Sequence, residues 1–187
     1  MGEGRKNVSQ NNINIDNKKC NNRKEKTLNM KKVKLHKIVD ELQMRFMDTT
    51  VYYNKITGKI LNVNDDDFRI VEDDDFENDI EKYPEWQKEH LKEVYNLMYE
   101  DIDNYISLPN SFDIRDSDIM EDFIETIKNE TKRQQLKNCM WQKGMYRKFK
   151  DKLLQIGLEK QYYKFYDEKL KEIAIEWCRE NNLEYEE

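Results

Sequence analysis

The residues with the most chemistry to offer lie between positions 141 and 150, where cationic and aromatic side chains alternate. Cations neutralise phosphates and aromatic rings stack on bases, so this pattern is typical of a nucleic-acid contact. Gly144 frees the backbone where a helix is expected to begin, and an anion is stabilised there. We take the segment as a candidate site for an anion or a partner, with these binding residues: Lys143, Tyr146, Arg147, Lys148 and Lys150.

The same segment also has a purely structural interpretation. Tyr146, Phe149 and Leu153 recur at intervals of three and four residues, which places them on one face of a helix as core residues. The cations would then lie on the solvent side, with their stems covering apolar surface. Of these cations, Arg147 is the strongest binding candidate, because a guanidinium can hold a carboxylate or phosphate with paired hydrogen bonds. The sequence leaves both interpretations open.

A second charged segment, residues 65–81, contains ten aspartates and glutamates. An EF-hand calcium loop needs a glycine at its sixth position and a glutamate at its twelfth, and no register of this segment supplies both. We therefore expect a solvated loop whose charges repel one another. Alternatively, the acidic segment docks on the basic helix around Arg147 in the same molecule, which would make both charge runs structural.

Signatures of catalysis, metal binding and cofactor binding are missing from the sequence. It contains no G-x-S-x-G, no P-loop and no H-E-x-x-H, and its two histidines offer little for a zinc or serine–histidine site. Cys139 and Cys178 lie in apolar helical patterns, which suits buried thiols in a reducing compartment. Trp86, Trp141 and Trp177 are expected in the core. We expect no cofactor, no metal and no catalytic residue.

Composition limits the possible classes of protein. The chain has 187 residues, of which 39% are charged and 11% aromatic, enough for one domain with a core. It has no apolar run of the ~18 residues that a membrane span needs and no signal-peptide pattern, so a cytoplasmic protein without a membrane partner is expected. The net charge of −6 weighs against DNA binding, since DNA-binding domains are more often basic.

Local patterns divide the chain into a tail and a domain. Residues 1–30 are rich in asparagine and lysine, which predicts a disordered tail, and residues 31–187 are expected to form a single α+β domain. A small antiparallel sheet near its N-terminal side should pack on a helix-dominated C-terminal half. The expected strands are a hairpin over 49–63 that turns at Gly58, with a third strand over 68–71, and residues 105–108 are expected as a short strand or extended link. The expected helices span 32–47, 84–99, 118–141, 146–156 and 159–181.

Three blocks in the C-terminal half are distinctive in their order and spacing: YISLPNSFDIRDSDIMEDF, QKGMYRKFKDKL and QYYKFYDEKLKEIAIEWCREN. Together with the hairpin YYNKITGKILNV and the helix start at Pro84, they resemble the bacterial Uncharacterised Protein Family 0158. The resemblance covers roughly residues 33–182. Small departures, such as Tyr146 where the family has phenylalanine, keep the aromatic character. The resemblance implies a fold and carries no biochemical activity with it.

These observations favour a non-enzymatic cytoplasmic binding or regulatory protein that acts through a protein partner. The first alternative is a nucleic-acid or ribosome-associated protein that uses residues 141–150. The second alternative is an enzyme with an unrecognised site. A deep pocket that brings together Arg147, a carboxylate and a tyrosine would favour this alternative.

Overall fold

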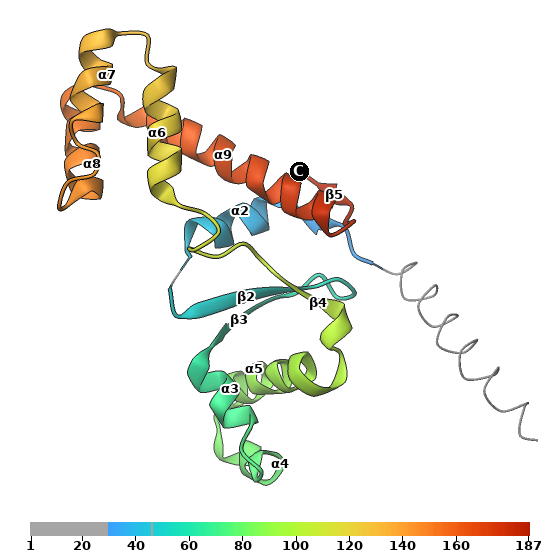
Figure 1. Cartoon of the computed structure of the whole chain (residues 1–187). Coiled ribbons are helices and arrows are strands. Elements are labelled where there is room, and N and C mark those ends of the chain that lie inside the picture. The colour runs from blue at the N-terminus through green and yellow to red at the C-terminus, as the bar shows by residue number, and fades with distance from the viewer. Residues whose placement is uncertain (1–29, 46) are drawn as a thin grey trace, which may run out of the picture.

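The structure, a computed structural model, describes residues 30–45 and 47–187. The predicted tail lies outside these residues, except for Met30. Helices dominate, and the strands form a three-stranded antiparallel sheet and a two-stranded parallel pair, so the α+β prediction is confirmed (Figure 1). The α-helices are α2 (Leu35–Gln43), α3 (Asp65–Val71), α4 (Phe76–Asp79), α5 (Glu85–Tyr95), α6 (Asp116–Thr126), α7 (Glu130–Lys137), α8 (Met145–Gln155) and α9 (Glu159–Glu180). The strands are β1 (Val33–Lys34), β2 (Thr49–Asn54), β3 (Ile60–Asn64), β4 (Tyr105–Ser107) and β5 (Tyr185–Glu186).

The sheet has the order β3-β2-β4, and the predicted hairpin forms between β2 and β3. Its turn is held by Asn54, whose buried side-chain oxygen accepts from the backbone N–H groups of Ile56 and Thr57 at 2.9 and 3.0 Å. Gly58 completes the turn with φ +71°, a left-handed conformation that glycine adopts without steric cost. The hairpin therefore follows from its turn residues.

The prediction of a strand over 68–71 is wrong, and so is the prediction of a loop over the acidic segment. Those residues begin with α3, whose start is fixed by a reciprocal cap: Asn64 accepts from the Asp67 N–H, and Asp67 accepts from the Asn64 N–H, both at 3.0 Å. Carboxylates in the first turn of a helix are stabilised by its dipole. The acidic residues favour a helix here, and the third strand is β4.

The prediction of one helix over 118–141 is also wrong, because α6 ends at Thr126 and α7 begins at Glu130. Ile127 is extended and only 8% exposed, so it turns into the core between the two helices. Asn129 then caps α7 by accepting from the Lys132 N–H at 3.0 Å. Asp118 and Glu121 have the spacing of a capping box, but α6 begins earlier, at Asp116, and has no side-chain cap.

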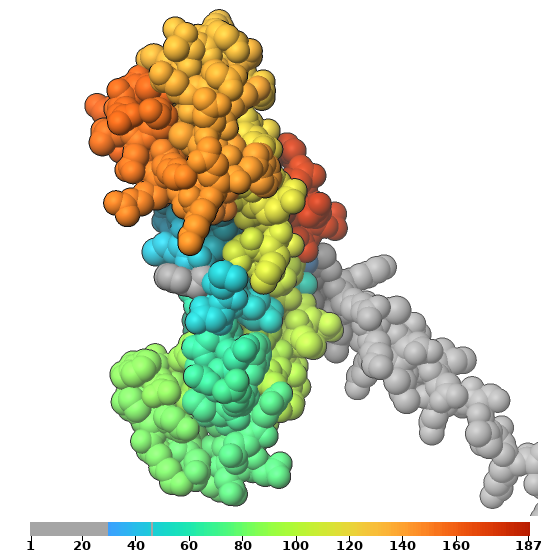
Figure 2. Space-filling model, turned by 60° about the vertical axis from the view of Figure 1, so that its left-hand side comes forward, coloured from blue at the N-terminus to red at the C-terminus, as the bar shows by residue number. Residues whose placement is uncertain are grey.

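Apolar side chains gather in three clusters along the molecule. One lies between α2, α9 and one face of the sheet, a second among α6, α7, α8 and α9, and a third between the other face of the sheet and α3–α5. The long helix α9 contributes to the first two, so it joins what we call the helical end (α6–α8) to the sheet. Figures 1 and 2 show the green segment with α3–α5 at the opposite end, which we call the sheet end.

Trp177 on α9 is the residue that ties this helix to the sheet. It is 4% exposed, its indole Nε1 donates to the Ser107 carbonyl at 2.9 Å, and its ring meets Tyr53 edge-on with centroids 5.9 Å apart. Trp177 is thus a core residue, as predicted. Trp86 and Trp141 are each 73% exposed, which overturns the prediction for both. Trp86 precedes the buried Leu91 by five residues, about 140° around α5, so it faces away from the core.

Candidate functional site

The predicted binding residues lie on and just before α8. Gly144 precedes the helix with φ +76°, and Phe149 and Leu153 are each 1% exposed, so the core interpretation is confirmed for those two. Tyr146 is 50% exposed and does not join them. The segment therefore combines a buried face with a half-exposed aromatic ring.

The predicted cations do not converge on one point. The Arg147 side chain is 91% exposed, and its Nε lies 3.9 Å from Asp151 Oδ2. Lys148 donates to Gln142 Oε1 at 2.9 Å, which directs it away along the surface. Lys143 is exposed as well. Among the predicted residues, only Tyr146 and Lys150 line a shared cavity.

That cavity, which we call the tyrosine cavity, has a volume of about 260 Å³ and lies where α2, α6, α8 and α9 meet. Phenol groups dominate its wall, together with one ammonium and one carboxylate. Arg147 is not part of it, so the pocket that would have favoured an enzyme is not formed with that residue. The lining residues are Gln43, Asp116, Met120, Tyr146, Phe149, Lys150, Tyr162, Tyr163 and Tyr166.

One wall of the tyrosine cavity is fixed by a network that the sequence analysis missed. The Arg45 side chain is 9% exposed, and its Nη2 donates to Asp116 Oδ1 at 2.7 Å, while its Nη1 donates to the Leu42 carbonyl. Tyr166 donates to the same Asp116 oxygen at 2.9 Å. Burial and the adjacent carboxylate raise the pKa of Tyr166, and Arg45 opposes that rise. The network holds the end of α2 against α6 and α9.

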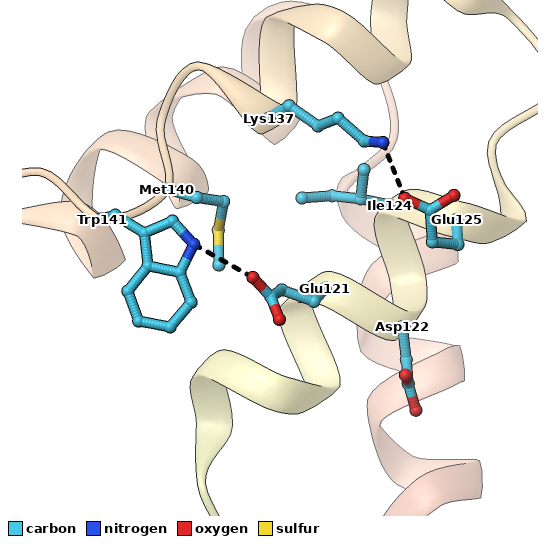
Figure 3. Close-up of a pocket in the computed structure, with 7 residues that line it drawn as sticks. All are labelled: Glu121, Asp122, Ile124, Glu125, Lys137, Met140 and Trp141. Carbon is cyan, nitrogen blue, oxygen red and sulfur yellow. Dashed lines mark hydrogen bonds and ion pairs between the residues drawn. The ribbon is translucent and has the colours of Figure 1, made fainter.

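A second site missed by the sequence analysis is a groove between α6 and α7 beside Trp141, which we call the Trp141 groove (Figure 3). It has a volume of about 560 Å³, and Ile124 and Met140 give it an apolar floor. The indole Nε1 of Trp141 donates to Glu121 at 3.0 Å, which fixes the orientation of an exposed ring. The groove is thus preformed around one tryptophan.

The backbone at Trp141 adopts φ +59°, a left-handed conformation that costs a non-glycine residue of the order of 1 kcal/mol or more. Its N–H donates to the Met145 sulfur at 3.3 Å, which stabilises the reversal between α7 and α8. This strained turn lifts the indole out of the core and onto the groove. Such positions are concentrated at functional sites.

Carboxylates of α6 surround the Trp141 groove, although the segment that follows α6 is basic. Glu125 pairs with Lys137 at 2.7 Å, and this hydrogen bond lowers the pKa of the Glu125 carboxyl. Asp122 points toward α9, where it lies 3.4 Å from Lys169 (Figure 3). Residues 127–164, in contrast, contain eleven lysines and arginines and three acidic residues. The Trp141 groove is therefore rimmed by carboxylates, while the chain that follows α6 is rich in lysine and arginine.

Docking of the acidic segment on the basic helix is contradicted by the structure. The acidic segment lies at the sheet end, and α8 lies at the helical end, on the far side of α2 and the sheet (Figures 1 and 2). Some carboxylates of the acidic segment are instead paired locally, as in Asp66–Arg69 at 2.9 Å and Glu81–Lys88 at 2.5 Å. The others lie on the surface, except Asp67, which is 8% exposed.

Two further properties bear on the class of protein. Over residues 30–45 and 47–187, no group of three histidine, cysteine, aspartate or glutamate side chains is placed to hold a metal ion. Within the same residues, no helix combines the length and apolarity needed to cross a membrane.

The fold and its grooves define a helix-dominated α+β protein with an exposed tryptophan at each end. The sequence profile described as "Uncharacterised protein family (UPF0158)" matches residues 83–186, more than half of the chain. The protein belongs to this family, which confirms the resemblance; its extension over residues 33–82 stays a prediction. No curated protein and no solved structure matches the chain.

Proposed function

We propose that the protein is a non-enzymatic binding protein of the cytoplasm that acts through a protein partner docked in the Trp141 groove. The observation that carries this proposal is the exposed Trp141 indole, 73% exposed yet fixed by its hydrogen bond to Glu121. Tryptophan is enriched among residues that dominate binding energy. Because the ring is already oriented, little conformational entropy is lost on binding.

The chemistry of the groove indicates the kind of segment it would accept. An apolar side chain of the partner can pack on Ile124 and Met140, next to the indole. The Glu121 carboxylate, which accepts from the Trp141 indole but has no cationic partner among the described residues, would attract a lysine or arginine of the partner, through complementarity that favours fast and specific association. A segment with one apolar and one basic residue fits both features.

Nucleic-acid binding is the second candidate, and the free cations of α8 favour it. The Arg147 side chain is almost fully exposed and contacts Asp151 only at 3.9 Å, so it is available to a phosphate. The carboxylates around Trp141 argue against this function, because they would repel a phosphate backbone near the one exposed indole of this end. Protein binding therefore ranks first.

An affinity pull-down from lysate, with and without nuclease treatment, tests the proposal, with bound proteins quantified by mass spectrometry. We compare the wild type with Trp141→Ala and with Trp86→Ala, a matched control that removes an equally exposed tryptophan at the other end. A partner that is retained by Trp86→Ala and falls at least tenfold with Trp141→Ala supports the proposal. The interaction is then repeated with the purified partner.

Other outcomes contradict it. If every partner survives the Trp141→Ala substitution, the groove is not the docking site. If partners vanish on nuclease treatment and with Arg147→Ala, the nucleic-acid candidate replaces it.

A further inference from the structure

A cavity between the hairpin turn and the start of α2 is lined by lysines, and we call it the lysine cavity. It has a volume of about 230 Å³ and shares no lining residue with the Trp141 groove or the tyrosine cavity. None of the described residues that line it is acidic. The lining residues are Lys31, Lys32, Lys34, Lys37, Ile38, Tyr53, Thr57, Gly58 and Ile60.

Three of the four lysines in the lysine cavity lack a counter-charge. Lys32 lies 3.2 Å from Glu184, whereas the ammonium groups of Lys31, Lys34 and Lys37 form no ion pair or hydrogen bond with the described residues. All three side chains are exposed. Because a lysine stem is long and flexible, each ammonium group can turn toward a ligand in the cavity. The lysine cavity therefore has three positive charges available to an anion.

The backbone that carries these lysines is held in place. The Lys31 N–H donates to the Lys55 carbonyl at 2.8 Å, and the buried Tyr53 donates its hydroxyl to the Lys31 carbonyl at 3.2 Å. Further along the chain, Val33 and Ile38 are at most 1% exposed, so the residues between them are anchored to the core. Only the lysine side chains have to be ordered when a ligand binds, which lowers the entropic cost of binding.

The start of α2 makes this concentration of positive charge unfavourable for the protein itself. The helix has no acidic residue in its first turn and no side-chain cap, and Lys34 and Lys37 lie there instead. The N-terminal end of a helix carries partial positive charge, so cations at this position destabilise the helix. Lysines three residues apart also repel one another. A bound anion would relieve both effects.

We propose that the lysine cavity binds a small ligand through an oligophosphate group, at a site separate from the Trp141 groove. Lysine is a common phosphate-binding residue, and several linked phosphates match three ammonium groups better than a single carboxylate does. The cavity is smaller than the roughly 300 Å³ of the smallest pockets that enclose a drug-sized ligand. The phosphates therefore occupy the cavity, and the rest of the ligand extends into solvent.

Isothermal titration of the full chain with inorganic triphosphate and inorganic phosphate tests this proposal, in about 0.15 M salt to screen diffuse attraction. The double variant Lys34→Gln/Lys37→Gln is compared with Lys160→Gln/Lys164→Gln, a control that removes the same charge from exposed positions of α9. We expect saturable binding of triphosphate, about tenfold or more tighter than that of phosphate. Its affinity should fall roughly tenfold or more in the first variant and stay unchanged in the control.

Thermal unfolding adds a readout that a structural role of the lysines would not produce. Without ligand, the Lys34→Gln/Lys37→Gln variant should unfold at or above the wild-type midpoint, because it removes positive charge from the start of α2. Triphosphate should raise the midpoint of the wild type and of the control, but not that of this variant. A lower midpoint of the variant without ligand would show that the two lysines serve the fold, and it would overturn the proposal.

The titration can also overturn the proposal in three ways: no saturable binding of triphosphate, equal affinity for phosphate and triphosphate, or an equal loss in both double variants. Single-stranded RNA of ten uridines is a third probe. If it binds and triphosphate does not, the ligand is a polynucleotide and the proposal of a small ligand is wrong. Trp141→Ala should bind triphosphate like the wild type, which keeps this test separate from that of the proposed protein partner.

Discussion

The sheet end and the segment that runs from the end of α6 into α9 carry opposite charge. Residues 65–104 contain sixteen acidic residues against four lysines and arginines, whereas residues 127–164 contain eleven lysines and arginines against three acidic residues. The two sets lie at opposite ends of the molecule (Figure 1), and salt screens charges beyond roughly 8–10 Å. The net charge of −6 therefore describes neither end.

The two ends also present their tryptophans differently. Trp141 is held by Glu121 and lies on a strained turn. Trp86 projects from the regular first turn of α5, and its indole makes no hydrogen bond with the described residues. Trp86 and Trp141 are therefore equally exposed, but only the Trp141 ring is held in a fixed orientation by a hydrogen bond. A fixed ring is expected to contribute more to binding than a mobile one, and the predictions below test how separate the two ends are.

The largest expected effect is that of Trp177→Ala, which removes the link between α9 and the sheet. We expect the free energy of unfolding to fall by roughly 3–5 kcal/mol, since a large buried side chain and its hydrogen bond to Ser107 are lost. Urea unfolding followed by circular dichroism measures this. Trp86→Ala and Trp141→Ala serve as controls and should each change the stability by less than about 1 kcal/mol. Equal losses in all three variants would contradict the distinction between core and surface tryptophans.

A smaller effect is expected from Arg45→Gln, which breaks the network that holds α2 against the helical end. Asp116 keeps its hydrogen bond to Tyr166 but loses its cation, so we expect a loss of about 1–3 kcal/mol. Thermal unfolding of this variant is compared with that of Arg147→Gln, whose side chain is 91% exposed in the wild type. If the two variants unfold at the same midpoint, the network does not stabilise the junction.

At the sheet end, Asn64→Ala removes the cap of α3 and should cost about 1 kcal/mol. Hydrogen exchange should increase at the first amides of α3, above all at Asp67, and remain unchanged in α6–α8. Asn62→Ala, on the same strand, is the control. The Asn62 side chain is exposed, and its one hydrogen bond among the described residues, to Glu41, is long at 3.4 Å. Faster exchange in α8 would show that the two ends are coupled.

The smallest effect concerns the boundary that we propose between a tail and a single domain at about residue 30. Deletion of residues 1–29 should leave the thermal midpoint within about 1 °C of the full chain, because it retains Met30, which packs on the α2–α9 cluster. Differential scanning calorimetry measures the midpoint. A fall of several degrees would place part of the deleted segment on the domain.

Short-range patterns in the sequence predicted local structure well. The hairpin with its turn at Gly58 and the burial of Phe149 and Leu153 all depend on neighbours within a few residues. The start of α3 was missed, although its signal, Asn64 three residues before Asp67, is present in the sequence. The acidic residues were interpreted as a loop whose charges repel one another, and their ability to cap and stabilise the start of a helix was overlooked.

The candidate sites were harder to predict because they are assembled from distant residues. Arg45 meets Asp116 and Tyr166, which follow it by 71 and 121 residues, and no local pattern indicates such a contact. Lys143, Tyr146, Arg147, Lys148 and Lys150 were predicted together as binding residues, with Arg147 as the strongest, and the structure brings Tyr146 and Lys150 to one cavity. A charge pattern in the sequence does not tell in which direction each side chain points.

The placement of α9 has a consequence for the order of events during protein synthesis. The sheet end is built from residues 49–107, a continuous stretch that can fold while the rest of the chain is still being made. The other face of the sheet needs Trp177, and β1 pairs with β5, so α2 and Tyr53 remain uncovered until the ribosome has produced residues 177–186. For about seventy residues of translation, the nascent chain exposes an apolar face that a chaperone can bind.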